Sequence, residues 1–233
     1  LPRGFSILDP SDLEGIVAEL VATADRGRAR AAQWRISAWK NALVAPANAL
    51  AAAKDAAAVA AARAYVRYGD ALAAYRAVDF DDLIALPVTL FDRDAEVRER
   101  WQARFDHVLV DEYQDTNPAQ YRLFRHLVGA RARFTAVGDD DQAIYGWRGA
   151  TLENLAQLPR DYPALAVVKL EQNYRSCVRI LKSANALIAN NPKLFEKRLW
   201  SELGHGDAIR VLPAGDDEAE AELVVARLLA HKF

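Results

Sequence analysis

Two adjacent carboxylates, Asp111 and Glu112, follow the short apolar run at residues 108–110. If that run is a strand, both side chains lie at its carboxyl end. In a nucleotide hydrolase, one such carboxylate holds Mg²⁺, directly or through water, and the next accepts a proton from the attacking water. A helix N-cap with an acid in its first turn fits the same two residues, so the pair alone leaves both interpretations open.

A second acidic group, residues 139–141, consists of three successive aspartates after the apolar run at 134–137, and Gln142 follows it. Neighbouring carboxylates repel one another, which costs stability unless a cation or a basic partner lies near. A solvated turn is the alternative interpretation.

The next residues bring Tyr145, Trp147 and Arg148 together within four positions. Flat side chains beside an arginine can stack on bases while the guanidinium neutralises phosphate, which is the chemistry of a single-stranded nucleic-acid site. Packing of Trp147 into the core is the competing interpretation.

A third element, LEQNYRS at residues 170–176, leaves an expected strand and enters a helix with Ser176 as its N-cap. There Arg175 could reach a phosphate on a facing domain, and Tyr174 could stack on a base. An ordinary surface salt bridge would explain Arg175 equally well.

The elements that must position these residues alternate after residue 100. Apolar, β-rich runs at 108–110, 134–137, 166–170 and 208–212 alternate with helical patterns at 118–128, 176–190 and 216–230. This order predicts an α/β fold with a parallel sheet, whose functional residues gather at the carboxyl ends of the strands.

The first ninety residues have a helical pattern instead. Ser11 is the expected N-cap of the first helix, a second helix ends before Pro46, and the alanine-rich stretch 51–62 continues as one helix through Tyr75. Asp79 is expected to cap a further helix. These patterns predict an all-helical lobe.

Charge is segregated along the chain although the net charge is only −2. Residues 26–78 carry nine Lys/Arg against Asp55 and Asp70, a local charge of +7, whereas residues 79–118 carry a local charge of −7. Such asymmetry suggests an anionic partner for the first stretch and a cation for the second.

Composition narrows the class of protein further. The chain has 233 residues, 52% of them hydrophobic, one cysteine (Cys177) and no methionine. A reducing, cytoplasmic location is expected, since there is no disulfide pair, signal peptide or apolar run long enough for a membrane span. The missing methionine and an unterminated helical pattern at the end suggest a piece of a longer protein.

Taken together, the texts VDFDDL, VLVDEYQDT, VGDDDQAIYGWRGA and LEQNYRS resemble the motifs of superfamily 1 DNA helicases of the UvrD, PcrA and Rep group. The text ILKSANALIANNPKLFEKRLWSELGHG is most similar to the Rep branch. The resemblance covers essentially the whole chain and is weaker through the alanine-rich helices. It implies an incomplete RecA-like P-loop NTPase motor with a helical insertion lobe.

The resemblance also implies roles for matching residues. Asp111 would hold the Mg²⁺ of bound ATP, with Glu112 beside it as a second metal-site carboxylate and the base for water. Gln142 would sense the γ-phosphate, Tyr174 would pack on the adenine, and Arg175 would be an arginine finger. Three residues would line the single-stranded DNA track: Tyr145, Trp147 and Arg148.

The implied segments are a 1B-like helical lobe (1–78), the returning half of domain 1A (79–165) and the start of domain 2A (166–233). The lobe would contact DNA, although its aromatic residues, Trp34, Trp39, Tyr65 and Tyr68, suit a core better than a base platform. The implied partners are single-stranded DNA, single-strand/duplex junctions and replication or repair proteins, with no membrane.

One family motif is missing, because no glycine in this chain precedes a lysine and the phosphate-cradling GxxxxGK[ST] loop is therefore absent. The expectation is a helicase of 3′ to 5′ direction as the intact protein, with this chain alone unable to hydrolyse ATP. Three alternatives remain open: a Mg²⁺-dependent phosphohydrolase or nuclease, a noncatalytic DNA- or partner-binding module, and a helicase-nuclease relative.

Overall fold

The computed structural model describes residues 4–231 and divides into two compact units, 1–166 and 167–233. Almost all of the buried apolar side chains lie in the first unit. Among the described residues of the second unit, Leu181 alone is a buried hydrophobic residue. The first unit therefore has a core of its own, and the second has little.

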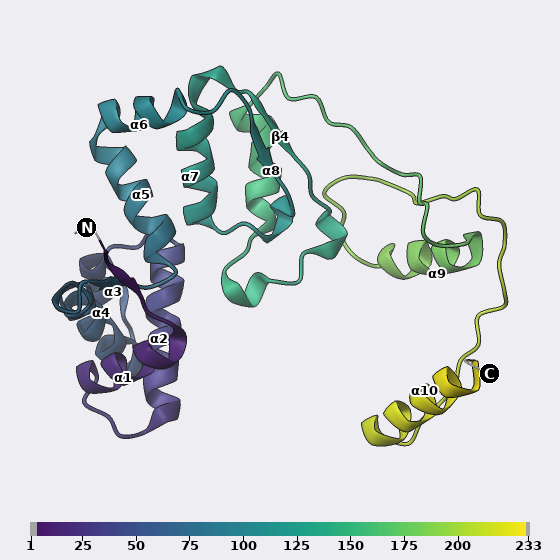
Figure 1. Ribbon diagram of the computed structural model, residues 1–233, viewed down its shortest axis with the longest axis horizontal. Coiled ribbons are helices and arrows are strands. Elements are labelled where there is room, and N and C mark those ends of the chain that lie inside the picture. The colour runs from purple at the N-terminus through teal and green to yellow at the C-terminus, as the bar shows by residue number, and fades with distance from the viewer. Residues whose placement is uncertain (1–3, 232–233) are drawn as a thin grey trace. The chain divides into compact units, whose positions relative to one another are not determined.

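A bundle of four helices begins the first unit (Figure 1): α1 (Pro10–Leu20), α2 (Arg26–Asn41), α3 (Pro46–Ala52) and α4 (Ala56–Ala74). Its core combines Leu13, Val17 and Ile36 with buried alanines of α4. Small alanine side chains let α4 lie close to its neighbours, and Trp39 stacks on Tyr65 with ring centroids 5.8 Å apart. Residues 10–74 are thus helical as predicted, but the lobe is not all-helical, since two short strands flank these helices.

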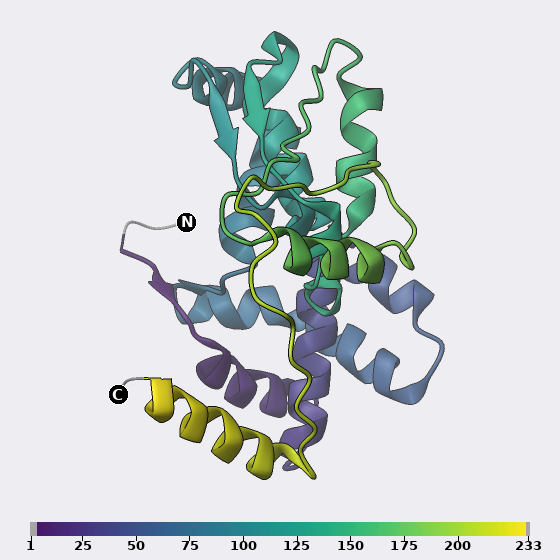
Figure 2. The same cartoon turned by 90° about the vertical axis from the view of Figure 1, so that its right-hand side faces the viewer.

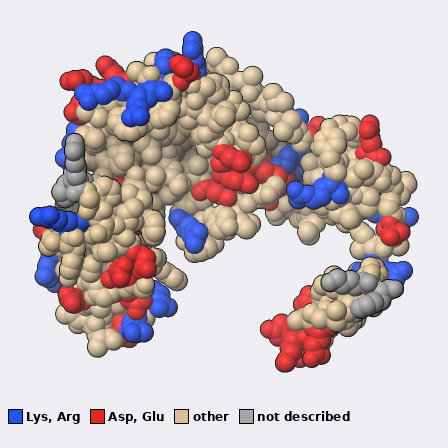
Figure 3. All heavy atoms as spheres, viewed as in Figure 1, with Lys and Arg blue, Asp and Glu red and all other residues tan. Residues whose placement is uncertain are grey.

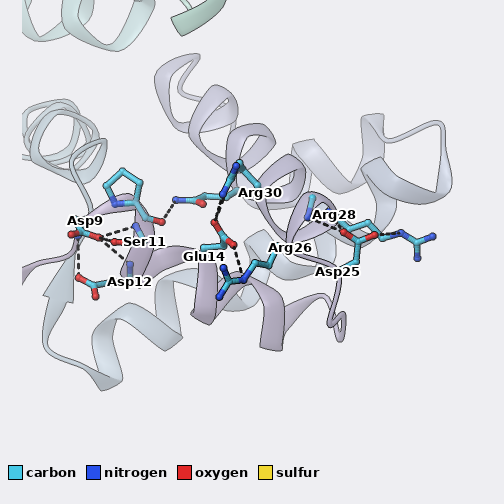
Figure 4. Close-up of polar contacts among 11 residues, drawn as sticks. Asp9, Ser11, Asp12, Glu14, Asp25, Arg26, Arg28 and Arg30 are labelled. Atoms are coloured by element: carbon cyan, nitrogen blue, oxygen red, sulfur yellow. Dashed lines mark hydrogen bonds and ion pairs between the residues drawn. The ribbon is translucent and has the colours of Figure 1, made fainter.

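Two of the predicted helix boundaries are wrong. Asp9 caps α1 in place of Ser11, since its carboxylate accepts hydrogen bonds from the amides of Ser11 and Asp12 at 2.8 and 3.0 Å (Figure 4). The alanine-rich stretch is not one helix either, because α3 ends at Ala52 and the carboxylate of Asp55 accepts a hydrogen bond from the Ala58 amide to start α4. An aspartate cap sets both helix starts, and at Asp55 it outweighs the helix propensity of the alanines.

The rest of the first unit mixes helices with two pairs of short parallel strands. Strand β1 (Ser6–Ile7) pairs with β2 (Ala77–Val78), and β3 (Val108–Val110) pairs in register with β4 (Phe134–Ala136), as the adjacent arrows of Figure 2 show. The helices are α5 (Asp82–Arg93), α6 (Ala95–Gln102), α7 (Pro118–Val128) and α8 (Leu152–Asp161). Parallel pairing confirms the α/β prediction for this part of the chain.

The end of α2 is joined to the start of α5 through buried charges. Lys40, 7% exposed, places Nζ 2.6 Å from Asp79 and 2.7 Å from Asp82, and the Tyr68 hydroxyl donates to Asp79 at 2.9 Å. Burial raises the pKa of Asp82, although the Lys40 ammonium opposes the rise. Asp79 also accepts a hydrogen bond from the Asp82 amide at 2.8 Å, but the N-cap position of α5 is Asp81, so the predicted cap at Asp79 is wrong.

An aromatic core supports β3 and β4 from one side. Tyr113 is completely buried and lies edge-on to Phe124 of α7, which is edge-on to Phe134 of β4 with centroids 5.0 Å apart. Asn117 and Gln120 form a capping box at the start of α7. This packing fixes the strand ends from which the acidic residues project.

The second unit contains α9 (Val178–Ile188) and α10 (Asp217–His231). The strands predicted at 166–170 and 208–212 are wrong, since the only β contact described in this unit is one parallel bridge between Gln172 and Trp200. Leu170 is 80% and Val211 88% exposed, so these apolar runs have no neighbouring strand to pair with among the described residues. Ser176 is not the N-cap of α9 either; that position is Cys177.

Candidate nucleotide and DNA site

The carboxyl ends of β3 and β4 bring two acidic segments side by side. Val137 donates its amide to the Val110 carbonyl at 2.8 Å, and Tyr113 donates back to the Val137 carbonyl at 2.9 Å. Between these bonds lie Asp111 and Glu112, both exposed at the strand end. The strand interpretation of this pair is therefore correct. Glu112 also stands at the N-cap position of a short 3₁₀ helix, Tyr113–Asp115, but its side chain makes no capping hydrogen bond.

Glu112 has a left-handed backbone with φ +48° and ψ 46°. Few non-glycine residues adopt this conformation, and such outliers concentrate where the surrounding structure holds a functional side chain. The Glu112 amide donates to the Asp111 carboxylate at 2.9 Å. The chain therefore turns sharply directly after β3.

Gln114 joins the two acidic segments, a role that sequence reasoning missed. Its side chain is 2% exposed; Nε2 donates to the Glu112 carboxylate at 2.7 Å, and Oε1 accepts the Asp139 amide at 3.0 Å. A buried glutamine with both ends satisfied holds its partners in one geometry. The only signal in the sequence was its place within DEYQDT, since an amide side chain has no distinctive pattern of its own.

Gly138 allows the segment that carries Asp139 to lie close to Gln114 and Tyr113. A Cβ at this position would lie 3.1 Å from Gln114 Oε1 and 3.3 Å from Tyr113 Cβ. A larger residue would therefore separate Asp139 from Gln114.

The three aspartates at 139–141 form the short turn after β4. Asp139 accepts hydrogen bonds from the Asp141 amide at 3.1 Å and from Gln142 Nε2 at 2.6 Å. One ligand atom of each aspartate lies within 4.8 Å of the others. Hydrogen bonds thus offset part of the expected repulsion, and Gln142 is held at the same edge as Asp111 and Glu112.

The aromatic residues that follow form an exposed cluster with arginine. Trp147 is 73% exposed, and the Arg148 guanidinium lies 4.7 Å from its ring centroid and 5.7 Å from that of Tyr145. The core-packing interpretation of Trp147 is therefore wrong. A flat exposed ring with a cation beside it can accept a base and a phosphate at once.

One contact ties the carboxylate segment to the chain that follows this cluster. Thr116 accepts hydrogen bonds at its carbonyl from the Thr151 amide at 3.1 Å and from Asn154 Nδ2 at 2.9 Å. Asn154 is 3% exposed. The Tyr145–Arg148 turn is therefore anchored to the segment that carries Asp111 and Glu112.

In the second unit, Tyr174 and Arg175 lie in an exposed turn before α9. The Tyr174 hydroxyl donates to Gln172 at 2.8 Å, and the Asn173 side chain accepts the amides of Arg175 and Ser176 at 3.0 and 2.8 Å. The Arg175 side chain is exposed. The Asn173 side chain therefore stabilises this turn, at the place where the sequence predicted a helix N-cap at Ser176.

The basic lobe is more nearly neutral than its local count implied. Arg26 and Arg30 pair with Glu14, and Arg28 pairs with Asp25, acids that lie outside the counted stretch (Figure 4). In the view of Figure 3, basic and acidic side chains alternate over this lobe. Trp34 is 68% exposed, whereas Tyr65 and Tyr68 belong to the core.

Two family models match the chain. One, described as the UvrD/REP helicase N-terminal domain, covers residues 1–163, and the other, the UvrD-like helicase C-terminal domain, covers 168–232. Within residues 4–231, no helix combines the length and apolarity that crossing a membrane requires.

Curated relatives agree with these models. The chain is 53% identical over its whole length to ATP-dependent DNA helicase Rep of Salmonella typhimurium and 52% identical to that of Escherichia coli, spanning 35% of each. It is 38% identical to ATP-dependent DNA helicase PcrA of Staphylococcus aureus, of which it spans 32%. The chain thus spans about a third of the length of these relatives. The resemblance carried by the motifs is confirmed, and the chain belongs to the UvrD/Rep helicase family.

Proposed function

We propose that the intact protein couples ATP hydrolysis to 3′ to 5′ movement on single-stranded DNA and to duplex unwinding in replication or repair. The observation that carries this proposal is the Gln114 bridge between Glu112 and Asp139, which joins a carboxylate pair to a turn ending in an exposed base-stacking cluster. Relatives named ATP-dependent DNA helicases support it.

At the nucleotide end, Asp111 would hold Mg²⁺, with Glu112 beside it as the base for the attacking water. Exposed carboxylate oxygens are the ligand type that Mg²⁺ prefers, so the residues present fit the ion. Bound Mg²⁺ would neutralise charge on the phosphates of ATP. Gln114 keeps one Glu112 oxygen occupied and so orients the other, and Gln142 would sense the γ-phosphate.

At the DNA end, Trp147 would stack on a base, while Tyr145 and Arg148 would line the same track. The Arg148 guanidinium supplies positive charge for a phosphate. In the second unit, Tyr174 would pack on the adenine and Arg175 would act as the arginine finger, roles that their exposed positions permit. The partners would be single-stranded DNA, its junctions with duplex, and replication or repair proteins of the cytoplasm.

The chain alone is expected to bind single-stranded DNA without hydrolysing ATP. A GxxxxGK[ST] loop supplies backbone amides and a lysine to the triphosphate, and these contacts provide much of the positioning and charge stabilisation that hydrolysis needs. Without them, Glu112 has no correctly placed phosphate to act upon.

A titration of a fluorescent oligothymidylate, at low and moderate salt and with or without Mg²⁺-ATP, tests both statements while phosphate release is recorded. Salt-weakened binding without phosphate release is expected, because phosphate contacts displace counterions. Trp147→Ala should weaken binding about fivefold or more, since stacking contributes about 1–3 kcal/mol per base. Tyr75→Ala, which removes an aromatic ring 62% exposed at the end of α4, is the matched control.

Three results would contradict the proposal. Phosphate release that Glu112→Gln abolishes would disprove the inactivity of the chain alone. Metal-dependent DNA cleavage without ATP would favour a nuclease. Equal binding by the Trp147→Ala and wild-type chains would favour a module that binds through its helical lobe.

A further inference from the structure

Asn41, the last residue of α2, connects the helical bundle to the segment that carries the candidate nucleotide residues. Its Nδ2 donates to Asp81 at 3.1 Å, and its Oδ1 accepts a hydrogen bond from Asn117 Nδ2 at 2.8 Å. The two asparagines are 76 positions apart in the chain. One side chain therefore contacts two elements of the other half of the unit.

Asn117 lies between the carboxylate segment and α7. Its Oδ1 accepts the Gln120 amide at 2.9 Å as the N-cap of α7, and the residue before it, Thr116, ends the segment that begins at Asp111. Asn117 is 9% exposed. Its Nδ2 donates to Asn41, so the last residue of α2 contacts the α7 cap directly.

Asn41 also lies beside the end of the aromatic turn. Gly149, which closes that turn with φ +85°, is near Asn41, since a Cβ at position 149 would be in ordinary van der Waals contact, 3.9 Å from Asn41 Cβ. Two residues later, Thr151 donates to the Thr116 carbonyl at 3.1 Å. Asn41 thus binds Asn117 and lies near Gly149, and the Thr151–Thr116 hydrogen bond links the two segments that these residues belong to.

The end of α2 is rigidly held at this point. Its neighbour Lys40 is buried between Asp79 and Asp82, with ion-pair distances of 2.6 and 2.7 Å. Burial also raises the pKa of Asp81, the second partner of Asn41, although hydrogen bonds from Ser37 and Asn41 oppose the rise. A buried lysine that pairs with two carboxylates does not shift without breaking both ion pairs.

We propose that Asn41 is a positioning residue that fixes the carboxylate segment and the aromatic turn relative to each other, so that the helical bundle couples the DNA end to the nucleotide end. The coupling of the DNA end to the nucleotide end rests on the proposed function. The connection between the bundle and the two segments rests only on the contacts of Asn41. No residue of the bundle was assigned such a role from the sequence.

Amide hydrogen exchange of the whole chain tests the joint without any ligand. Asn41→Ala should speed exchange at residues 112–117 and also at 149–151, although neither segment belongs to the bundle. In the same variant, binding of the oligothymidylate should weaken by about two- to tenfold, the factor that one lost hydrogen bond represents. Faster exchange confined to α2 and α5 would overturn the proposal.

A reciprocal exchange of side chains separates positioning from general loss of stability. Asn41→Asp alone sets a carboxylate against Asp81 and should reproduce or exceed the defect. The double variant Asn41→Asp, Asp81→Asn restores a donor and an acceptor at the same net charge, and Asn117 can still donate to the new carboxylate. Recovery of exchange and of DNA binding is expected. If the double variant exchanges as fast and binds DNA as weakly as Asn41→Asp, the positioning role is contradicted. This comparison remains decisive even if Asn41→Ala fails to fold.

Asn185→Ala is the matched control, since this asparagine also bridges two segments, donating to the Leu199 carbonyl at 2.8 Å and accepting its amide at 3.2 Å, but in the second unit. It should leave exchange at 112–117 unchanged. If the wild-type chain does not bind DNA, the proposed function fails, and the exchange data still decide whether Asn41 positions both segments.

Discussion

At the scale of single residues, Lys40 is the buried cation that pairs with the buried Asp79 and the partly buried Asp82. Lys40→Met should lower the free energy of unfolding by about 3–5 kcal/mol, because it leaves both carboxylates without their cation and Asp79 buried. Urea denaturation measures the loss. The exposed Lys54 provides the comparison, and Lys54→Met should change stability by no more than about 0.5 kcal/mol. A loss below about 1 kcal/mol for Lys40→Met would contradict this view of the pair.

Gln114 permits a second prediction at this scale. Gln114→Ala removes the acceptor of the Asp139 amide and the donor to Glu112, so unfolding should become easier by about 2–3 kcal/mol. Gln33→Ala, which removes one exposed hydrogen bond to the Pro10 carbonyl, should cost far less in the same urea titration. Equal losses for the two variants would show that the bridge does not hold the acidic segments together.

The residue scale is also where sequence reasoning reached furthest. The place of Asp111 and Glu112 at a strand end was predicted correctly, because a short apolar run comes directly before them. Tyr145, Trp147 and Arg148 were singled out by their types and spacing, and the structure brings them into one cluster. The roles of these residues and of Gln142 stay predictions. Asn41 and Gln114 could not be found, since an amide side chain becomes important only through partners that lie far away in sequence.

At the scale of elements, the packing of α7 on α5 should depend on pH through His126. Burial lowers the pKa of His126 below its ordinary value of 6.5, as do Arg122 and Arg98, while Asp92 opposes this shift from 2.9 Å. His126 therefore binds a proton more readily in the unfolded chain than in the folded one. The folded state loses stability as the pH falls below about 6.5, the ordinary histidine pKa. The pKa of Asp92 is lowered in the folded state, so the stability that its carboxylate contributes is lost only as the pH falls below 3.8.

The thermal midpoint of unfolding should accordingly fall between about pH 7 and pH 5, and His126→Gln should flatten that slope. His107→Gln, at an exposed histidine before β3, serves as the control. A slope that survives in His126→Gln would assign the pH dependence to another group.

Boundaries of elements were predicted less well than their existence. The start of α1 was misplaced because Asp9 and Ser11 are both good capping residues, and only the structure shows which carboxylate or hydroxyl faces the free amides. The two missing strands have a different cause. An apolar run forms a strand only when a neighbour offers hydrogen bonds, and periodicity does not report the neighbour.

At the scale of the whole molecule, the two units differ in how much apolar surface they bury. Among the described hydrophobic residues of the second unit, Leu181 alone is buried, while Leu170, Leu187 and Val211 are largely exposed. Regions with few buried apolar contacts open at low free energy.

Amide exchange in residues 167–231 should therefore be complete while α4 is still protected, and the second unit should lose its helices at lower urea concentration. Exchange followed by mass spectrometry, peptide by peptide, measures this directly. Simultaneous loss of protection in both units would show that the chain unfolds as one cooperative body. The structure divides into two units, 1–166 and 167–233, and the predicted division into three segments, 1–78, 79–165 and 166–233, stays a prediction.

The left-handed backbone of Glu112 has a consequence for protein design. Glycine or asparagine satisfies that conformation with less strain than glutamate. A calculation that optimises folding alone would thus favour a residue without the carboxylate, and repeated selection for heat resistance would push in the same direction. Position 112 is a place where an engineer must fix the amino acid in advance, because the requirements of folding disagree there with the role proposed for the carboxylate.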